Sequence, residues 1–128
     1  MIENQAILLD TNAVINFLNG ESLEVGLIQD KKIVISEITE MEIQCIPTLS
    51  QTERKLLKEF LGDCIIIRLN ELIKDTAIKI RLSTRLKLMD AIIAATAQTL
   101  NLVLVTSDEK FESIKTTKVL LFPSLSKR

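Results

Sequence analysis

The sequence predicts an α/β fold, a three-layer α/β/α sandwich in which a short parallel sheet lies between helices. The first reason is length, because 128 residues suffice for one compact domain and not for two. The second is that the apolar segments are short and continuous, which is typical of strands covered on both faces. The third is that helical patterns separate these segments, which implies parallel strands joined by right-handed crossovers.

Five short apolar runs are the predicted strands. Each is rich in Ile, Leu or Val and is bounded by polar residues or turn signals. The runs are Ala6–Leu9, Ile33–Ile35, Ile65–Ile67, Leu102–Val105 and Val119–Phe122. Pro123 stops the last run, because proline cannot donate a hydrogen bond within a sheet.

Helical patterns lie between the predicted strands. Ser50 and Glu53 form a capping box, which predicts that a helix starts there. Asn70 is a suitable cap for a second helix. Asp90 begins a strongly apolar helix that continues to Leu100. Together with the strands, these helices complete the predicted sandwich.

The composition excludes several kinds of chemistry. The chain has no His, so catalytic triads, general bases and metal ligands based on His are ruled out. Its two Cys residues cannot form a zinc site without His partners. The 16 Lys and Arg nearly balance the 17 Asp and Glu, which disfavours a generally basic nucleic-acid binder. Acid–base or metal chemistry must therefore use carboxylates.

No segment has the pattern of a targeting or membrane sequence. The longest apolar stretches have five residues or fewer, and no positive charge precedes the first of them. We therefore expect neither a signal peptide nor a membrane helix, and we expect a cytoplasmic location.

Four carboxylates have placements that suggest a shared site. In an open parallel sheet, function gathers at the carboxyl ends of the strands, near the point where the strand order reverses. Asp10 follows the first predicted strand and Asp108 follows the fourth, so the two face each other if these strands are neighbours. Glu42 shares the apolar face of a helix that starts at Ser36, and Asp90 precedes an apolar helix. We expect Glu42 to lie on the face that packs against the sheet.

Carboxylates without His suit one kind of chemistry. Crowded carboxylates repel each other, and a hard divalent cation such as Mg²⁺ relieves the repulsion. Such an ion lowers the pKa of a bound water and stabilises a leaving oxyanion, so the natural substrate is a phosphodiester. A purely structural interpretation also exists, because Asp10, Asp90 and Asp108 suit helix caps or first turns. Capping does not explain Glu42.

Four segments of the chain resemble, in order, the motifs of the PIN-domain ribonuclease family. They are Leu8–Asn12, Ile35–Ile43, Leu88–Ala97 and Val105–Phe111. A lone Asp-Thr-Asn is a weak signal, but the ordered set spans nearly the whole chain. The resemblance implies a single PIN-like nuclease domain over residues 1–128, with a flavodoxin-like variant of the fold.

The same resemblance implies a function. It implies a hydrolase that cleaves phosphodiester bonds of single-stranded RNA and depends on Mg²⁺ or Mn²⁺. The implied catalytic and metal-binding residues are Asp10, Glu42, Asp90 and Asp108, and the implied polar supports are Asn12 and Thr106. A stand-alone domain of this size resembles the VapC-type toxin of a bacterial type II toxin–antitoxin pair, which implies a small antitoxin partner and a homodimer.

Two positions depart from the family pattern. Many relatives carry a further acid two residues after the last aspartate, where this chain has Lys110. The usual glycine after the second-segment helix is missing, and the sequence there is Gln44–Pro47. Lys110 affects whether a second metal ion can bind, and the missing glycine affects the wall of the groove.

One stretch without acids, between Asp75 and Asp90, carries basic residues that are candidates for RNA binding. They are Lys79, Arg81, Arg85 and Lys87. Arg81 and Arg85 lie four residues apart, which places them on one face of the expected helix. The stretch either guides an RNA backbone toward the carboxylates or is a solvated helix face, and we favour the second interpretation.

The sequence-based hypothesis is therefore a metal-dependent endoribonuclease. The alternative is a PIN-like domain without cleavage activity that serves as an RNA-binding or protein-interaction module. A receiver-type signalling domain is disfavoured, because no phosphorylatable Asp follows the third predicted strand. A haloacid-dehalogenase-like phosphatase is disfavoured as well, because Asn12 stands where that class carries its second Asp.

Overall fold

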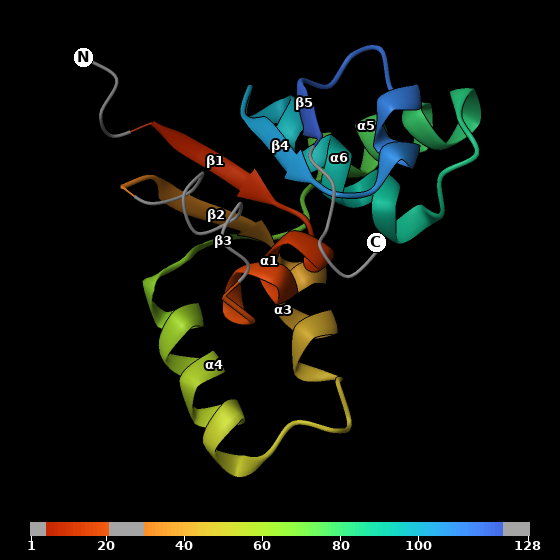
Figure 1. Cartoon of the computed structure of the whole chain (residues 1–128). Helices are drawn as coiled ribbons and strands as arrows, with labels where there is room; N and C mark the ends of the chain where they lie inside the picture. The colour runs from red at the N-terminus through yellow and green to blue at the C-terminus, as the bar shows by residue number, and fades with distance from the viewer. Residues whose placement is uncertain (1–4, 21–29, 122–128) are drawn as a thin grey trace.

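The computed structural model describes residues 5–20 and 30–121 of the chain. Figure 1 shows how its helices and strands are arranged. They are β1 (Ala6–Leu9), α1 (Thr11–Leu18), β2 (Lys32–Ser36), α3 (Glu37–Gln44), α4 (Gln51–Asp63), β3 (Ile65–Ile67), α5 (Glu71–Ser83), α6 (Leu88–Thr99), β4 (Val103–Thr106), the 3₁₀ helix η1 (Glu109–Ser113) and β5 (Val119–Leu121).

The described strands form one parallel sheet in the order β3-β2-β1-β4-β5. Leu8 of the central strand β1 pairs with Val34 of β2 on one side and with Leu104 of β4 on the other. The chain therefore builds the sheet outward from β1 through β2 and β3, and then returns to add β4 and β5 on the other side. The first and fourth strands are therefore neighbours, and the strand order reverses between them.

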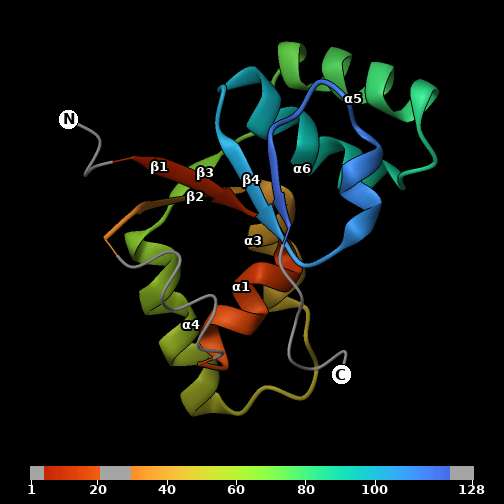
Figure 2. The ribbon, with the colours of Figure 1, turned by 45° about the horizontal axis from the view of Figure 1, so that its top comes forward.

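Alternate side chains of the strands enter two cores on opposite faces of the sheet, as the two-residue repeat of a strand requires. Leu8 and Leu104 belong to the core that α5 and α6 cover. Leu9 and Val105 belong to the core that α1 and α4 cover. Figures 1 and 2 show these two helical layers on either side of the sheet. The predicted three-layer α/β/α sandwich is confirmed.

The predicted strands match the described ones closely. β1 and β3 have the predicted bounds, whereas β2 gains one residue at each end and β4 is displaced by one residue. Phe122, the end of the last predicted strand, and Pro123, which was expected to stop it, lie outside the described residues, and so do Met1–Asn4. Within residues 5–20 and 30–121, no helix is long and apolar enough to cross a membrane.

Three of the four predicted helix starts are confirmed, and the first is Ser36, whose side chain caps α3. Ser50 caps α4 through a complete capping box with Glu53, and Asn70 caps α5. The fourth prediction is wrong, because α6 begins at Leu88 rather than at Asp90. The backbone N–H of Ala91 already donates to the carbonyl of Lys87 at 2.9 Å, so the helical ladder starts there. Asp90 therefore lies inside the first turn of α6 and not before it.

Candidate active site

Asp10 ends β1 and is held in place from two sides. Its Oδ1 accepts a hydrogen bond of 2.8 Å from the backbone N–H of Ala13, which caps α1. Its Oδ2 accepts one of 2.5 Å from the hydroxyl of Thr106, the last residue of β4. Only 3% of Asp10 is exposed to solvent. Asp10 therefore caps α1 and also lies at the switch point of the sheet.

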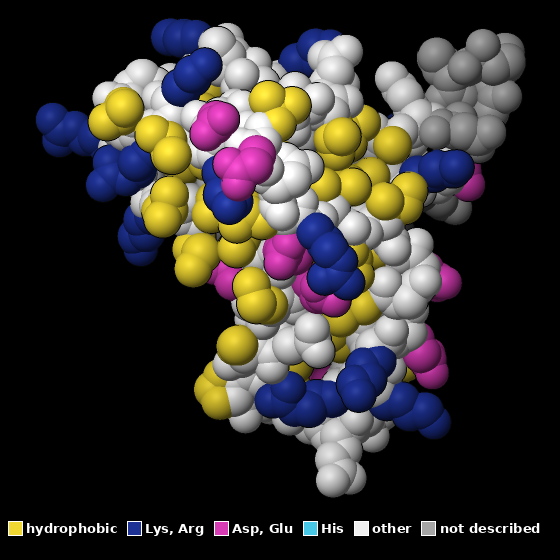
Figure 3. Space-filling model, turned by 180° about the vertical axis from the view of Figure 1, so that it is seen from behind, with side chains coloured by type: hydrophobic (Ala, Val, Ile, Leu, Met, Phe, Trp, Pro, Cys, Tyr) yellow, Lys and Arg dark blue, Asp and Glu magenta, His cyan; other side chains and the backbone are white. Residues whose placement is uncertain are grey.

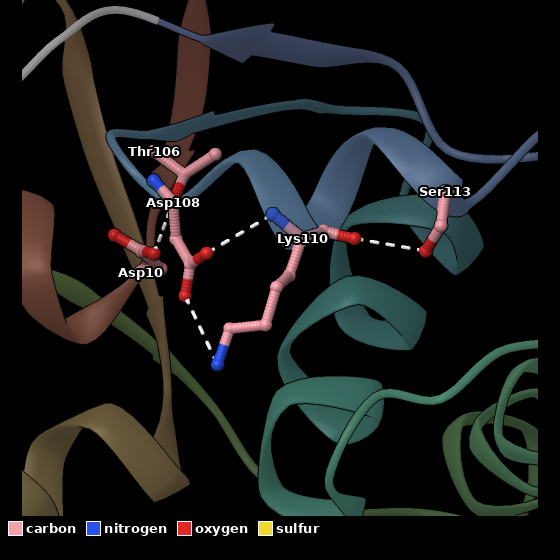
Figure 4. A network of polar contacts seen from close by, with 5 residues as sticks. All are labelled: Asp10, Thr106, Asp108, Lys110 and Ser113. Carbon is pink, nitrogen blue, oxygen red and sulfur yellow. Dashed lines mark hydrogen bonds and ion pairs between the residues drawn. The ribbon is translucent and has the colours of Figure 1, made fainter.

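Thr106 connects the two aspartates that follow β1 and β4. While its hydroxyl donates to Asp10, the same oxygen accepts a hydrogen bond of 2.9 Å from the backbone N–H of Asp108. The residue is fully buried. Figure 4 shows Thr106 next to both Asp10 and Asp108. The predicted placement of Thr106 beside the carboxylates is thus observed, and its functional role stays a prediction.

Asp108 caps the 3₁₀ helix η1 and contacts Lys110 with both carboxylate oxygens. Oδ1 accepts a hydrogen bond of 3.0 Å from the backbone N–H of Lys110, and Oδ2 lies 3.7 Å from the Lys110 ammonium. These contacts are drawn in Figure 4. Lys110, which departs from the family pattern, thus lies beside the carboxylate of Asp108, a contact that the sequence pattern did not predict.

Asp90 reaches the same region from the first turn of α6 and is partly buried. Burial raises the pKa of the Asp90 carboxyl, and the charges of Asp108 and Glu42 raise it further, while Lys110 and Lys87 lower it. Asp108, Glu42, Lys110 and Lys87 therefore lie near enough to Asp90 for their charges to act on it. We call Asp10, Glu42, Asp90 and Asp108 the carboxylate cluster.

Glu42 does not lie where the helical pattern predicted. The side chain is exposed rather than buried against the sheet. The helix α3 follows β2 directly and continues past the ends of the strands, so the sheet does not cover its last turn (Figure 1). Glu42 Oε1 accepts a hydrogen bond of 2.5 Å from the hydroxyl of Thr11, the residue after Asp10. This contact fixes Glu42 at the edge of the carboxylate cluster.

Thr11 also belongs to this region, although it was not among the predicted site residues. Besides its bond to Glu42, its hydroxyl lies 3.1 Å from the hydroxyl of Thr39, which is buried on α3. The signal available in the sequence was its position directly after Asp10, at the carboxyl end of a strand. Asn12, which was predicted as a support, is exposed, and no hydrogen bond joins it to the carboxylate cluster within the described ranges.

Among the four predicted RNA-binding residues, Arg81 and Arg85 do not share a helix face, contrary to the prediction. Lys79 and Arg81 are exposed on α5, but α5 ends at Ser83, so Arg85 lies in the following loop. The helix ends because Thr84 adopts an extended backbone and its hydroxyl donates to the carbonyl of Ile80 at 2.8 Å. Of the four, only Lys87 has a charge that lowers the pKa of Asp90.

The donor set of the carboxylate cluster fits a hard, partly hydrated cation. The cluster offers only oxygen ligands, which Mg²⁺ and Mn²⁺ accept. In the part of the chain that the structure describes, no three Asp, Glu or Cys side chains are close enough to hold one ion jointly. Mg²⁺ does not need such a cage, because it keeps several waters and usually binds one or two carboxylates together with phosphate oxygens.

Asp10 gives the metal-free protein a defined pH dependence. Burial raises the pKa of Asp10 from 3.8 to about 6; the hydrogen bonds from Thr106 and Ala13 lower it, and the charges of Asp108 and Asp90 raise it. Because the folded-state pKa is the higher one, the stability that comes from protonating Asp10 is present below about pH 4. It is lost as the pH rises through about 6, and it amounts to about 3 kcal/mol.

We therefore expect the metal-free parent to lose stability between pH 4 and pH 7 relative to an Asp10→Asn variant. The measurement is denaturant unfolding of both proteins in the presence of a chelator across this pH range. Taking the difference between the two proteins removes the contributions of all other titrating groups. A parent that gained stability relative to the variant over this range would contradict the raised pKa of Asp10.

Comparisons with known proteins agree with this geometry. The model of the PIN domain family matches residues 7–116. A toxin–antitoxin complex from Klebsiella pneumoniae contains a chain with the same fold, at a TM-score of 0.81 and 28% identity, covering 92% of this chain and 99% of that one. A comparison with curated protein sequences found no match.

Two further solved structures share the fold at lower identity. VapBC2 from Rickettsia felis, bound to a DNA fragment from its promoter, matches with a TM-score of 0.79 at 20% identity, over 92% of this chain and 99% of that one. DNA-bound VapBC from Salmonella typhimurium matches with a TM-score of 0.77 at 21% identity, over 91% and 97%. The family model covers most of the chain, and the switch point and parallel sheet are those of its fold; the chain therefore belongs to the PIN domain family.

Proposed function

We propose that the protein is a divalent-metal-dependent endoribonuclease that cleaves single-stranded RNA, and that it is the toxin of a type II toxin–antitoxin pair. Ribonuclease activity is the general function of the PIN family. The observation that carries the proposal is the carboxylate cluster, in which the ends of β1 and β4 and the helices α3 and α6 each contribute one acid. Burial, and to a smaller extent the neighbouring carboxylates, raises the pKa values of Asp10 and Asp90, and a bound cation would stabilise the charged forms of both groups.

In this proposal Asp10 and Asp90 hold the cation, and Asp108 and Glu42 supply further negative charge around it. When bound, the metal activates a water and stabilises the oxyanion that leaves the phosphodiester. The chain orients Asp10 through Ala13 and Thr106, and each carboxylate oxygen keeps a lone pair for a ligand. Asp90 accepts no hydrogen bond among the described residues, so its oxygens are available to water or metal.

The test of this function is RNA cleavage by the purified chain. Single-stranded RNA should be cut in Mn²⁺ or Mg²⁺ and should remain intact when a chelator is added. RNA that is bound but never cut would favour the alternative, a PIN-like binding module without catalysis. RNA that is neither cut nor bound would favour the other alternative, a protein-interaction module.

The proposed partners are a small antitoxin and a second copy of the chain. The similar chain from Klebsiella pneumoniae comes from a toxin–antitoxin complex, and the two VapBC structures were determined with DNA. By analogy we propose that an antitoxin controls the nuclease of this protein. Co-purification with the product of an adjacent short reading frame tests this partner.

For the homodimer, α5 offers the surface. Leu72, Ile78 and Leu82 are 63%, 54% and 83% exposed, although they are large and apolar. Figure 3 shows exposed hydrophobic side chains among Lys and Arg over the part of the molecule that contains α5. Acids lie in the first half of α5 and Arg81 lies near its end, so two antiparallel copies would place opposite charges together.

We expect the parent to be a dimer in solution and Leu82→Glu to be a monomer, because the new charge would be buried at the interface. Light scattering after gel filtration measures the mass. Leu56→Glu is the matched control, since Leu56 is 58% exposed on α4 and outside this surface. A monomeric parent, or a Leu82→Glu protein that stays dimeric, would count against α5 as the interface.

A further inference from the structure

Lys110 is the one basic residue that contacts a member of the carboxylate cluster through both its backbone and its side chain, within the described residues. The backbone N–H holds Asp108 Oδ1 at 3.0 Å, and the ammonium lies 3.7 Å from Asp108 Oδ2. The Lys110 side chain is 60% exposed and that of Asp108 only 19%. An exposed ion pair by itself contributes little stability. Here, however, the hydrogen bond from the backbone N–H of Lys110 to Asp108 holds Lys110 in place, so its ammonium stays beside the Asp108 carboxylate.

The charge of Lys110 also reaches Asp90. Lys110 is the strongest of the charges that lower the pKa of Asp90, whereas Asp108 and Glu42 raise it. Asp108 and Asp90 come from different elements, η1 and α6. One ammonium therefore offsets negative charge on two sides of the carboxylate cluster, as a bound cation would.

The carboxylates differ in what already binds them. Both oxygens of Asp108 are engaged by Lys110, and those of Asp10 by uncharged donors from Ala13 and Thr106. No hydrogen bond within the described ranges reaches the Asp90 carboxylate. A divalent ion next to Asp108 would be repelled by the Lys110 ammonium, which is already bound to that carboxylate. A divalent ion between Asp10 and Asp90 would meet two carboxylates to which no ammonium is bound.

We propose that the Lys110 ammonium occupies the place of a second divalent cation beside Asp108, so that the carboxylate cluster binds one divalent ion and not two. This inference rests on the proposed metal-dependent function. Lys110 is then a positioning residue, which acts through Asp108 and the local charge. Replacing its ammonium by a carboxylate changes the charge of the cluster by two units, which is the charge of one divalent ion.

The experiment is a titration of Mn²⁺ into the full chain, followed by calorimetry and by the electron paramagnetic resonance signal of free Mn²⁺. The parent should bind one Mn²⁺ per chain, and Lys110→Glu should bind two. Lys110→Gln, which removes the charge without adding a ligand, should still bind one Mn²⁺, about tenfold more tightly. Circular dichroism in a chelator confirms that both variants are folded, as the exposure of Lys110 leads us to expect.

The matched control is Lys115→Glu. Lys115 is exposed in the loop after η1, and its charge is not among those that shift the pKa of Asp10 or Asp90. This variant makes the same change in net charge but should bind Mn²⁺ as the parent does. A parent that binds two Mn²⁺ with similar affinity, or a Lys110→Glu protein that binds one Mn²⁺ like the parent, would overturn the inference alone. A parent that binds no Mn²⁺ would overturn both this inference and the proposed function.

Discussion

Replacement of Asp10 by Asn is expected to lower the rate of Mn²⁺-dependent RNA cleavage by about a thousandfold, which corresponds to a loss of ~4 kcal/mol of transition-state stabilisation. Asn has the shape of Asp but lacks the charge that would hold the cation. The side-chain amide can keep the cap on α1, because its oxygen still accepts from the backbone N–H of Ala13. Thr106 can rotate its hydroxyl to accept from the new amide group.

Cleavage of a labelled single-stranded RNA in excess enzyme measures this effect, and thermal unfolding in a chelator verifies the fold. Asp63→Asn is the control, since Asp63 is exposed at the end of α4, away from the carboxylate cluster. An Asp10→Asn protein that cleaves RNA as fast as the parent in Mn²⁺ would show that Asp10 is a helix cap and nothing more.

The second large effect is expected for Asp90→Asn, and its sign depends on the metal. Burial and neighbouring carboxylates raise the pKa of Asp90, which means that the folded protein disfavours its charged form. In a chelator, the variant should therefore melt a few degrees above the parent. With Mn²⁺ added, the parent should gain stability according to its affinity for the ion, and the variant should gain much less.

If Asp90 has only a structural role, the Asp90→Asn variant should melt below the parent in a chelator and should respond to Mn²⁺ as the parent does. An acid in the first turn of a helix is stabilised by the helix dipole, so its loss would cost about 0.3–1 kcal/mol. A lower melting temperature in chelator, together with an undiminished response to Mn²⁺, would refute the shared cation site. Glu59→Gln provides the control, because Glu59 is exposed on α4 and should leave both measurements unchanged.

Local sequence signals predicted most of the fold. Each strand is a continuous apolar run, and burial on both faces of a parallel sheet is what such runs require. The capping side chains of Ser50 and Asn70 act within three residues, so their effect is visible in the sequence itself. The sequence placed Asp10 and Asp108 together only on the condition that the first and fourth strands are neighbours, and the pairing of β1 with β4 meets that condition.

Features that depend on tertiary contacts were not predictable in the same way. The helical repeat predicted that Glu42 packs against the sheet, which is wrong because the sheet does not extend under that turn of α3. The start of α6 was misplaced because Asp90 is a good capping residue, although the backbone ladder begins before it. The contact of Lys110 with Asp108 depends on the tight turn of η1, which no apolar pattern marks. The catalytic roles of the four acids stay predictions.

The order of the strands also has a consequence for protein synthesis. The hydroxyl of Thr106 and the carboxylate of Asp10 are 96 positions apart in the sequence, and they meet because β1 pairs with β4 in the centre of the sheet. A nascent chain can build β1, β2 and β3 while it emerges from the ribosome, but it has neither Thr106 nor Asp108 until translation has passed them. Such distant pairings also form late, since the intervening loop must close first. A chain translated only as far as β3 thus lacks Asp90 and Asp108, which are half of the carboxylate cluster, and the cluster is complete only after Asp108 has been added.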